Sequence, residues 1–393
     1  MTSSVDPLAV DHLPYGSLLD ADGLRFAAVR WGEAAFDLTR WSRQTPFAEL
    51  FGDGSLDGLL AAGHRTWDEL RAAVVAALGV PATLAAFCRP LAWTTPTLPF
   101  APGDYVDFYA SRDHATNVGR ILRPDGEPLT PNWRHLPIGY HGRAGTIVVS
   151  GTEIRRPWGQ FRTADGDIEF AASDRLDLEA EVAFVLGGST TLGESIPLVD
   201  ARDYIFGVCL LNDWSARDIQ SWEYVPLGPF LGKSFATSMS PWITPLSALE
   251  DAWLAPPARD TQLLAYLDDA GRRDALDLAL EVRINGQLMS RPPFPGMYWT
   301  PAQMLAHLTV NGASIRPGDL FASGTVSGPT PDQVGSLLEL TWNGTRPKPL
   351  GDGRMLRFLE DGDEVAISAT APGRHGRITL GECRGRVVEA VQR

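Results

Sequence analysis

Residues 178–185 read Leu178-Glu179-Ala180-Glu181-Val182-Ala183-Phe184-Val185, and we interpret the rest of the chain from this stretch. Its valine and phenylalanine residues favour a β-strand, in which alternate side chains share a face, so Glu179 and Glu181 point the same way. Two adjacent carboxylates repel each other, and a hard divalent cation with oxygen ligands removes that repulsion. The alternative is an edge strand with a solvated polar face, which a Glu-x-Glu pair alone more often indicates.

The composition indicates a globular protein of more than one domain. The chain has 393 residues, of which 44% are hydrophobic and 21% charged, and this length favours two domains. We find no apolar run long enough to span a bilayer, and Met1–Asp6 carries no basic region followed by an apolar core. The three cysteines are scattered without paired spacing, which fits a reducing compartment. We therefore expect a cytoplasmic enzyme that does not contact a membrane.

The charge balance limits the possible partners. The formal net charge is -14 and no basic block occurs, so we expect no nucleic-acid partner. An anionic substrate is repelled by the general field of such a protein. The binding of such a substrate must therefore depend on a few local cationic side chains or on a bound metal ion.

We expect residues 1–105 to form a smaller domain without catalytic residues. A strand is expected over 24–32 and a helix over 66–78, with Thr66 as N-cap and Glu69 completing a capping box. Residues 106–393 form the second predicted domain, whose first segment is rich in acidic and aromatic residues.

That segment places Asp107 and Tyr109 on one face of an extended chain, and His114 follows shortly after. An isolated histidine is more often structural or solvated than catalytic. Further along, residues 204–211 predict a buried strand that ends at Asn212 and Asp213. These positions are candidates to join the Glu-x-Glu pair.

A predicted helix follows over residues 215–224, and it places Arg217, Gln220 and Tyr224 on one face. The alternative is an ordinary solvated helix face. The next loop carries a single lysine, Lys233, whose apolar neighbours favour burial. The glycine spacing of this loop is not that of a phosphate-binding P-loop.

The remainder of the chain is mostly β in pattern. Alternating apolar residues over 276–284 lead into Asn285-Gly286, which predicts a hairpin. A short helix is expected over 300–308, with Pro301 in its first turn. We expect Glu339 to lie within a strand over 336–342.

Taken together, these segments resemble the fumarylacetoacetate hydrolase (fumarylacetoacetase) family over nearly the whole chain. The resemblance rests on Asp107-Phe108-Tyr109-Ala110-Ser111-Arg112, His114-Ala115-Thr116-Asn117-Val118-Gly119, the stretch from Pro131-Asn132-Trp133 through Gly142-Arg143, Glu179-x-Glu181, Asn212-Asp213-Trp214-Ser215-Ala216-Arg217-Asp218-Ile219-Gln220, and Ser323-Gly324-Thr325-Val326-Ser327-Gly328-Pro329.

The resemblance implies a mainly β (α+β) protein that forms a homodimer. Residues 1–105 would be an SH3-like barrel domain with added helices, and residues 106–393 the family's β-roll catalytic domain. The family's metal ligands fall on four carboxylates, and all-oxygen ligands favour Mg²⁺ and/or Ca²⁺ over zinc. These ligands are Asp107, Glu179, Glu181 and Asp213, with Lys233 and Thr237 lining the metal region.

The resemblance also implies roles in catalysis. His114 would be the general base and Glu339 the carboxylate that orients it, because water needs a base of near-neutral pKa. Arg217, Gln220 and Lys233 would stabilise developing negative charge. The remaining matches would contact the substrate: Tyr109, Arg123, Tyr224 and Thr325.

The implied reaction is the hydrolysis of fumarylacetoacetate, a small anionic diketo acid, to fumarate and acetoacetate in tyrosine and phenylalanine catabolism. The same metal scaffold would serve a related acylpyruvate or diketone hydrolase, a decarboxylase or an isomerase. A third possibility is a binding protein that keeps the fold without activity. The His114 segment and the N-terminal domain favour the first reaction.

Overall fold

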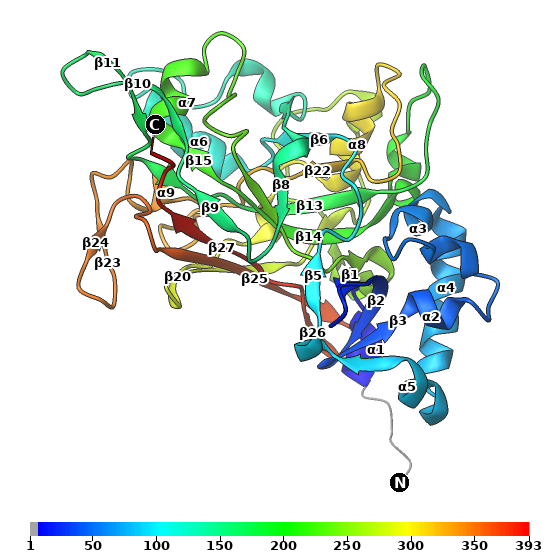
Figure 1. Cartoon of the computed structure of the whole chain (residues 1–393). Helices are drawn as coiled ribbons and strands as arrows, with labels where there is room; N and C mark the ends of the chain where they lie inside the picture. Colours follow the sequence, from blue (N-terminus) through cyan, green and yellow to red (C-terminus); the bar gives the residue numbers. More distant parts are fainter. Residues whose placement is uncertain (1–6, 393) are drawn as a thin grey trace.

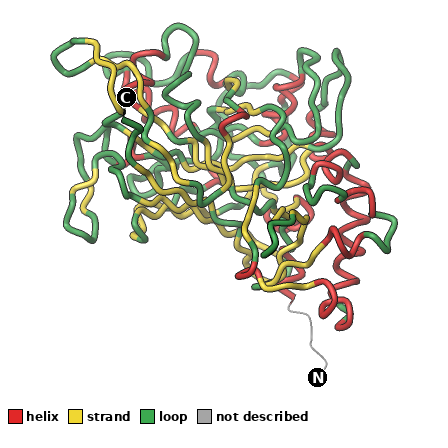
Figure 2. The backbone as a smooth tube through the Cα atoms, viewed as in Figure 1, coloured by secondary structure: helices red, strands yellow, loops and turns green. Residues whose placement is uncertain are grey.

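The structure is a computed structural model that describes residues 7–392. The expectation about Met1–Asp6 lies outside the described residues. Strands occupy the middle of the molecule, and many of the helices lie at its periphery (Figures 1 and 2).

The largest sheet has eight strands and carries most of the segments named above. Its order is β7-β6-β22-β13-β14-β16-β8, with β17 paired to β14. The strands are β6 (Tyr105–Phe108), β7 (Gly139–His141), β8 (Ile147–Val149), β13 (Ala180–Leu186), β14 (Ile205–Asp213), β16 (Thr237–Met239), β17 (Thr244–Pro245) and β22 (Leu320–Ala322).

The strand that contains Glu181 lies inside this sheet. β13 pairs antiparallel with β14 on one side and with β22 on the other, and all seven of its residues are buried. The alternative of a solvated edge strand is therefore wrong. Continuous apolar runs are typical of strands buried on both faces, as here.

The two faces of this sheet pack against different parts of the chain. Val182 and Phe184 point into the main core of the C-terminal part. Ala183 and Val185 point the other way, into a second core built largely from residues 13–100. Alternation along one strand thus joins the N-terminal part to the central sheet.

Within the described residues, the N-terminal part contains a five-stranded sheet of order β4-β3-β2-β1-β5 and five α-helices, among them α4 with 15 residues (Figure 1). Its strands are β1 (Tyr15–Leu19), β2 (Arg25–Trp31), β3 (Ala34–Asp37), β4 (Cys88–Pro90) and β5 (Thr95–Thr97). Its helices are α1 (Pro7–His12), α2 (Leu38–Ser42), α3 (Asp57–Ala61), α4 (His64–Leu78) and α5 (Pro81–Phe87).

Helix α4 confirms the helix expected here, but its predicted capping box is wrong. The helix begins at His64, and its N-cap is Gly63, whose φ of 79° suits glycine. Thr66 therefore lies inside the first turn. The Glu69 carboxylate instead accepts from the guanidinium of Arg65 at 3.0 Å, one turn earlier.

A second large sheet has the order β21-β20-β25-β27-β9, with β26 paired to β25. The predicted hairpin joins β20 to β21 through Asn285 and Gly286, which have φ of 50° and 78°. The strands are β9 (Glu153–Arg155), β20 (Ala279–Ile284), β21 (Gln287–Ser290), β25 (Glu364–Gly373), β26 (Gly376–Thr379) and β27 (Cys383–Val388).

The C-terminal part, as far as residue 392, also contains two-stranded pairs, four α-helices and several 3-10 turns. The pairs are β10 (Trp158–Arg162) with β11 (Ile168–Ala172), β12 (Leu176–Asp177) with β15 (Ser215–Ala216), β18 (Trp253–Leu254) with β19 (Ala275–Leu276), and β23 (Lys348–Pro349) with β24 (Met355–Leu356). The helices are α6 (Arg112–Leu122), α7 (Arg217–Glu223), α8 (Pro301–Thr309) and α9 (Leu337–Leu340).

These helices confirm two predictions and correct one. α7 lies within the helix expected over 215–224. α8 matches the helix expected over 300–308, and a capping box between Thr300 and Gln303 starts it. Glu339 lies in helix α9 and not in a strand, because the Ser336 hydroxyl accepts from the backbone N–H of Glu339 and starts a helical turn.

The structure confirms a mixed α and β chain rich in sheets. The SH3-like character of residues 1–105 and the boundary at residue 105 stay predictions. Within residues 7–392, no single helix is long and apolar enough to cross a membrane; α4 and α5 pass that test only as a pair, with a bend of 104° between them.

The contact between the two parts can be tested at Phe206 of β14. Its ring packs edge-on against Tyr15 and Trp67, with centroids 5.4 and 5.3 Å away. We expect Phe206→Ala to lower the free energy of unfolding by about 3–5 kcal/mol, because a buried ring is lost and a cavity remains. Urea-induced unfolding measures this loss.

The matched control is Phe230→Ala, which removes a ring that is 63% exposed. It should change the free energy of unfolding by less than about 0.5 kcal/mol. Equal losses in the two variants would contradict the assigned role of Phe206.

Candidate active site

Four carboxylates from three strands meet on one face of the central sheet. One oxygen from each can be chosen so that all four lie within 4.8 Å of one another. Glu181 lies in β13, and Glu179 directly precedes that strand. Asp213 ends β14, where its backbone N–H donates to the carbonyl of Glu179 at 3.2 Å. Asp107 comes from β6 and completes the carboxylate cluster.

The carboxylate cluster contains oxygens that nothing in the chain satisfies. Neither carboxylate oxygen of Glu181 has a hydrogen-bond partner among the described residues, and Oδ1 of Asp107 also has none. The side chain of Glu181 is fully buried. Burial of an ionised carboxylate without a partner is costly, so these oxygens fit a bound cation.

Ionisation within the carboxylate cluster leads to the same conclusion. Burial raises the pKa of Glu181 well above its usual value, and the charges of Asp107 and Asp213 raise it further. Burial and the Asp213 charge likewise raise the pKa of Asp107. All four donors are carboxylate oxygens, the ligands that Mg²⁺ and Ca²⁺ prefer.

Two buried cations offset part of this charge. The ammonium group of Lys233 donates to Oε2 of Glu179 and, at 2.9 Å, to Oδ2 of Asp213. Arg217 donates through Nη2 to Oε1 of Glu179 at 2.7 Å. Burial alone would raise the pKa of Glu179, but the charges of Lys233 and Arg217 outweigh it and hold that pKa below its usual value. The expected burial of Lys233 is confirmed.

Thr237 and Tyr140 both donate hydrogen bonds to the carboxylate of Asp213. The Thr237 hydroxyl donates to Oδ1 of Asp213 at 2.9 Å, and the Tyr140 hydroxyl donates to Oδ2 at 3.3 Å. Tyr140 lies on β7 directly opposite Asp107. Next to them is a cavity of about 180 Å³, lined by Tyr105, Tyr140, His141, Asp213, Phe230, Lys233 and Thr237 among others.

A histidine–glutamate pair forms the second part of the site. Nδ1 of His114 lies 2.7 Å from Oε2 of Glu339, and both side chains are buried. An ionised carboxylate only accepts hydrogen bonds, so Nδ1 carries a proton, and in the neutral imidazole Nε2 is then the nitrogen with the lone pair. His114 is held by helix α6, whose N-cap Ser111 accepts from the His114 backbone N–H at 3.2 Å.

Glu339 is held in place by further donors. Asn117 donates to Oε1 at 3.0 Å, while the hydroxyls of Ser327 and Ser336 each donate to Oε2 at 2.9 Å. Burial raises the pKa of Glu339, but the neighbouring His114 and these hydrogen bonds outweigh burial and leave the pKa below its usual value. The carboxylate is therefore ionised at neutral pH.

Tyr109 joins the pair to the carboxylate cluster. Its ring packs edge-on against His114, with ring centroids 5.4 Å apart. Burial raises the pKa of the Tyr109 hydroxyl, and the charges of both Glu339 and Glu179 add to this effect. Two charges from the two halves of the site thus act on one hydroxyl.

The remaining predicted residues surround this centre to different degrees. Gln220 accepts from Nη1 of Arg217 at 3.0 Å, and Thr325 has a buried hydroxyl without a hydrogen-bond partner among the described residues. Tyr224 ends helix α7 and is half-buried. Arg123 is exposed and donates to the carbonyl of Pro128 at 2.8 Å, and its charge partly offsets the burial that raises the pKa of Tyr109.

The sequence analysis did not identify three residues that form hydrogen bonds to the predicted site residues: Asn117, Tyr140 and Asp177. Asn117 follows His114 by three positions on α6, a spacing that places both on one helix face. Tyr140 and Asp177 gave no comparable local indication. Their contacts with Asp213 and Arg217 join residues 73 and 40 positions apart.

Comparison with known proteins gave consistent matches. A family model described as fumarylacetoacetate (FAA) hydrolase C-terminal matches residues 104–388. The fumarylacetoacetase of Homo sapiens is 46% identical over 358 residues, covering 87% of this chain and 85% of the human protein. That of Caenorhabditis elegans is 42% identical over 404 aligned positions, covering 97% and 96%.

Solved structures share the fold at low identity. A fumarylacetoacetate hydrolase from psychrophilic Exiguobacterium antarcticum superposes with a TM-score of 0.58 at 18% identity, covering 96% of this chain and 100% of that one. A 5-carboxymethyl-2-hydroxymuconate delta-isomerase from Mycobacterium smegmatis gives 0.52 at 18% identity, with the same coverage. These two matches establish the fold alone.

The unpartnered oxygens of Glu181 predict how the chain responds to metal. In chelator-treated wild type, saturating Mg²⁺ or Ca²⁺ at about 100 times the Kd should stabilise the folded state by about 2.7 kcal/mol. Glu181→Gln should lose most of this effect. Without metal it should be at least as stable as wild type, because an uncompensated buried charge is removed. Thermal unfolding with and without the ion measures both quantities.

The control is Glu169→Gln, which changes an exposed glutamate and should behave as wild type. A Glu181→Gln variant with an undiminished metal response would refute the assignment of Glu181 to the cation.

The lowered pKa of Glu339 predicts a pH dependence of stability. Its folded pKa lies below the usual value of 4.5, so the ionised carboxylate stabilises the folded state at neutral pH. This contribution is lost as the pH falls below about 4.5 and through the folded pKa. The difference in Tm between wild type and Glu339→Gln should therefore shrink in that range, and a difference that grows would contradict the pairing.

Proposed function

Because the chain belongs to the fumarylacetoacetate hydrolase family, we propose that it hydrolyses fumarylacetoacetate to fumarate and acetoacetate. The observation that carries this proposal is the His114–Glu339 pair beside a buried carboxylate cluster with unpartnered oxygens. The reaction adds water across one carbon–carbon bond, so it needs a base for the water and positive groups for the oxygens that become charged.

We propose that the carboxylate cluster holds a divalent cation, Mg²⁺ and/or Ca²⁺, through Asp107, Glu179, Glu181 and Asp213. When bound, the ion supplies a Lewis acid that polarises the carbonyl oxygens of the substrate. Thr237 orients Asp213, and Lys233 neutralises charge between Glu179 and Asp213. An ammonium group has no lone pair, so Lys233 acts by its charge.

His114 is the proposed general base. With Nδ1–H held by Glu339, its Nε2 takes a proton from water. The water oxygen bonds to the ketone carbon of the fumaryl group, and the carbon–carbon bond to the acetoacetate part then breaks. The bond's electron pair leaves on that part as an enolate, which takes up a proton to give acetoacetate.

Arg217, Gln220 and Lys233 are proposed to stabilise the developing charge. A guanidinium group has five N–H donors, and Arg217 commits one each to Asp177, Glu179 and Gln220. Among residues 7–392 its other two have no acceptor, so they suit a substrate oxygen. Loss of one such donor typically costs about 2.7–4 kcal/mol of barrier.

Substrate contacts are proposed for Tyr109, Thr325, Tyr224 and Arg123. Tyr109 is half-buried against His114, Thr325 is buried, and the unpartnered Thr325 hydroxyl suits a hydrogen bond to the substrate. Tyr224 is half-buried and Arg123 is exposed. For Arg123 a contact requires its side chain to leave the carbonyl of Pro128.

The wider setting follows from the same family membership. We propose an SH3-like domain over residues 1–105, a catalytic domain over 106–393, a homodimer, and a cytoplasmic enzyme of tyrosine and phenylalanine catabolism. The isomerase with the same fold indicates that fold alone does not select the reaction. Identities of 46% and 42% to fumarylacetoacetases are the reason to choose this one.

The test is turnover of fumarylacetoacetate by purified protein, followed by loss of its conjugated ultraviolet absorbance. A chelator should stop turnover, and Mg²⁺ or Ca²⁺ should restore it. His114→Ala should lower kcat by roughly 10²–10⁴-fold while metal-induced stabilisation stays normal, because the base is lost and the carboxylates remain.

His64→Ala, which changes an exposed histidine, is the control and should keep full turnover. Faster turnover of an acylpyruvate than of fumarylacetoacetate would assign the site to a related hydrolase. Near-normal turnover by His114→Ala would refute the assignment of the base.

A further inference from the structure

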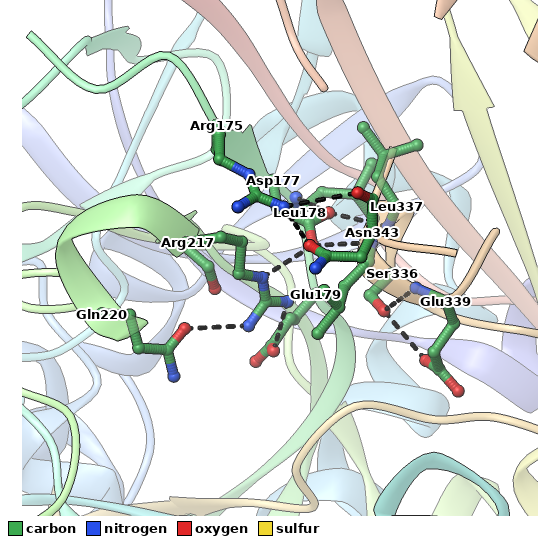
Figure 3. A network of polar contacts seen from close by, with 12 residues as sticks. Arg175, Asp177, Leu178, Glu179, Arg217, Gln220, Ser336, Leu337, Glu339 and Asn343 are labelled. Atoms are coloured by element: carbon green, nitrogen blue, oxygen red, sulfur yellow. Dashed lines mark hydrogen bonds and ion pairs between the residues drawn. The ribbon is translucent and has the colours of Figure 1, made fainter. Parts of the chain in front are cut away.

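We propose that Asp177 is a positioning residue that aligns the His114–Glu339 pair with the carboxylate cluster; this role rests on the proposed function. Asp177 is fully buried in β12, two positions before Glu179. Its carboxylate accepts from two different directions, one toward helix α9 and one toward Arg217 (Figure 3).

The first direction fixes the helix that carries Glu339. The backbone N–H of Leu337 donates to Oδ1 of Asp177 at 2.7 Å, and that of Leu338 donates to Oδ2 at 2.9 Å. These are the first N–H groups of α9, which have no acceptor within the helix. Because Glu339 is the next residue, the position of its carboxylate relative to Nδ1 of His114 depends on these two hydrogen bonds.

The second direction fixes the guanidinium group beside the cluster. Nε of Arg217 donates to Oδ2 of Asp177 at 2.8 Å. This bond sets the plane of the guanidinium group, whose outer nitrogens then reach Glu179 and Gln220 at 2.7 and 3.0 Å. The orientation of Arg217 toward a metal ligand and toward the substrate therefore depends on Asp177.

A carboxylate is the group that satisfies both directions at once. Its two oxygens receive four donors, the fourth being the backbone N–H of Leu178 at 2.7 Å. Asparagine has one acceptor oxygen, and its amide nitrogen would face either the N–H groups of Leu178 and Leu337 or the donors from Leu338 and Arg217. Asp177→Asn thus disturbs α9, Arg217 or both, although its volume is nearly unchanged.

The chain contains a matched control in its N-terminal part. Asp37 is also buried, accepts from the first turn of helix α2 through the Arg40 N–H at 2.9 Å, and pairs with Arg89 at 2.7 Å. Asp37→Asn keeps one oxygen that can cap α2 and loses the carboxylate oxygen that pairs with Arg89, so it removes a buried charge from a cap and ion pair far from the site. It should cost stability and leave turnover per folded molecule unchanged.

The experiment compares Asp177→Asn with Asp37→Asn in the metal-loaded, full-length protein. We expect Asp177→Asn to lower kcat by about 10–100-fold with little change in KM, and to weaken the Mg²⁺-induced rise in Tm. The downfield Nδ1–H proton resonance of His114, which reports its hydrogen bond to Glu339, should shift or disappear in ¹⁵N-histidine-labelled protein. Asp37→Asn should keep all three properties.

A third variant separates the two directions. Ser336→Ala removes a donor to Glu339 and the cap of α9 but leaves the bond between Asp177 and Arg217. It should change kcat and the His114 resonance and keep the response to Mg²⁺. If Asp177→Asn does not fold, Asp177→Glu keeps the charge and should retain the Mg²⁺ response while the longer side chain displaces α9 and shifts the resonance.

Wild-type kcat and an unshifted His114 resonance in a folded Asp177 variant would overturn the proposal. A loss of Tm equal to that of Asp37→Asn, with turnover unchanged, would also overturn it, because that is a purely structural role. Absence of turnover in the wild type would instead overturn the proposed reaction. The Mg²⁺ response and the resonance would still test the alignment.

Discussion

Repulsion among buried carboxylates is the constraint on which the site depends. Asp107, Glu181 and Asp213 each have a raised pKa because they are buried together, and the charge of Lys233 compensates them only in part. Such a cluster is unfavourable as an isolated feature of a core. It persists because the surrounding sheet is fixed by two hydrophobic cores, one on each face, and because a cation would convert the repulsion into attraction.

One face of the central sheet therefore both packs against the N-terminal part and carries the carboxylate cluster. At Ala183 and Val185 of β13 this face is apolar and packs against the N-terminal part, while at Glu181, near the start of the strand, it carries the carboxylates. The N-terminal part contributes none of the predicted catalytic residues, yet it covers the strands that hold them. Its packing fixes the backbone of β13 and β14, on which the mutual positions of the carboxylates depend.

Sequence patterns predicted features that are local along the chain. The shared face of Glu179 and Glu181, the strand that ends at Asp213 and the helix that carries Arg217 each follow from alternation or helical spacing. The prediction of a strand at Glu339 was wrong. The leucines around Glu339 suit a strand, but the hydrogen bond to the Ser336 N-cap stabilises a helical turn instead. The pairing of Glu339 with His114 joins residues 225 positions apart, and only the family resemblance connected them.

The order of strands in the central sheet has a consequence for how the chain folds. β22, made of residues 320–322, lies between β6 and β13, so strands from the start, middle and end of the C-terminal part alternate in space. Such non-local pairing makes folding slow, because long loops must close before their contacts form. During synthesis on the ribosome, Asp107 and Glu181 are made long before the strand that belongs between them. A chain interrupted before residue 320 thus lacks both the strand that places Asp107 beside Glu181 and the helix that carries Glu339, and the complete site appears only when nearly the whole protein has been synthesised.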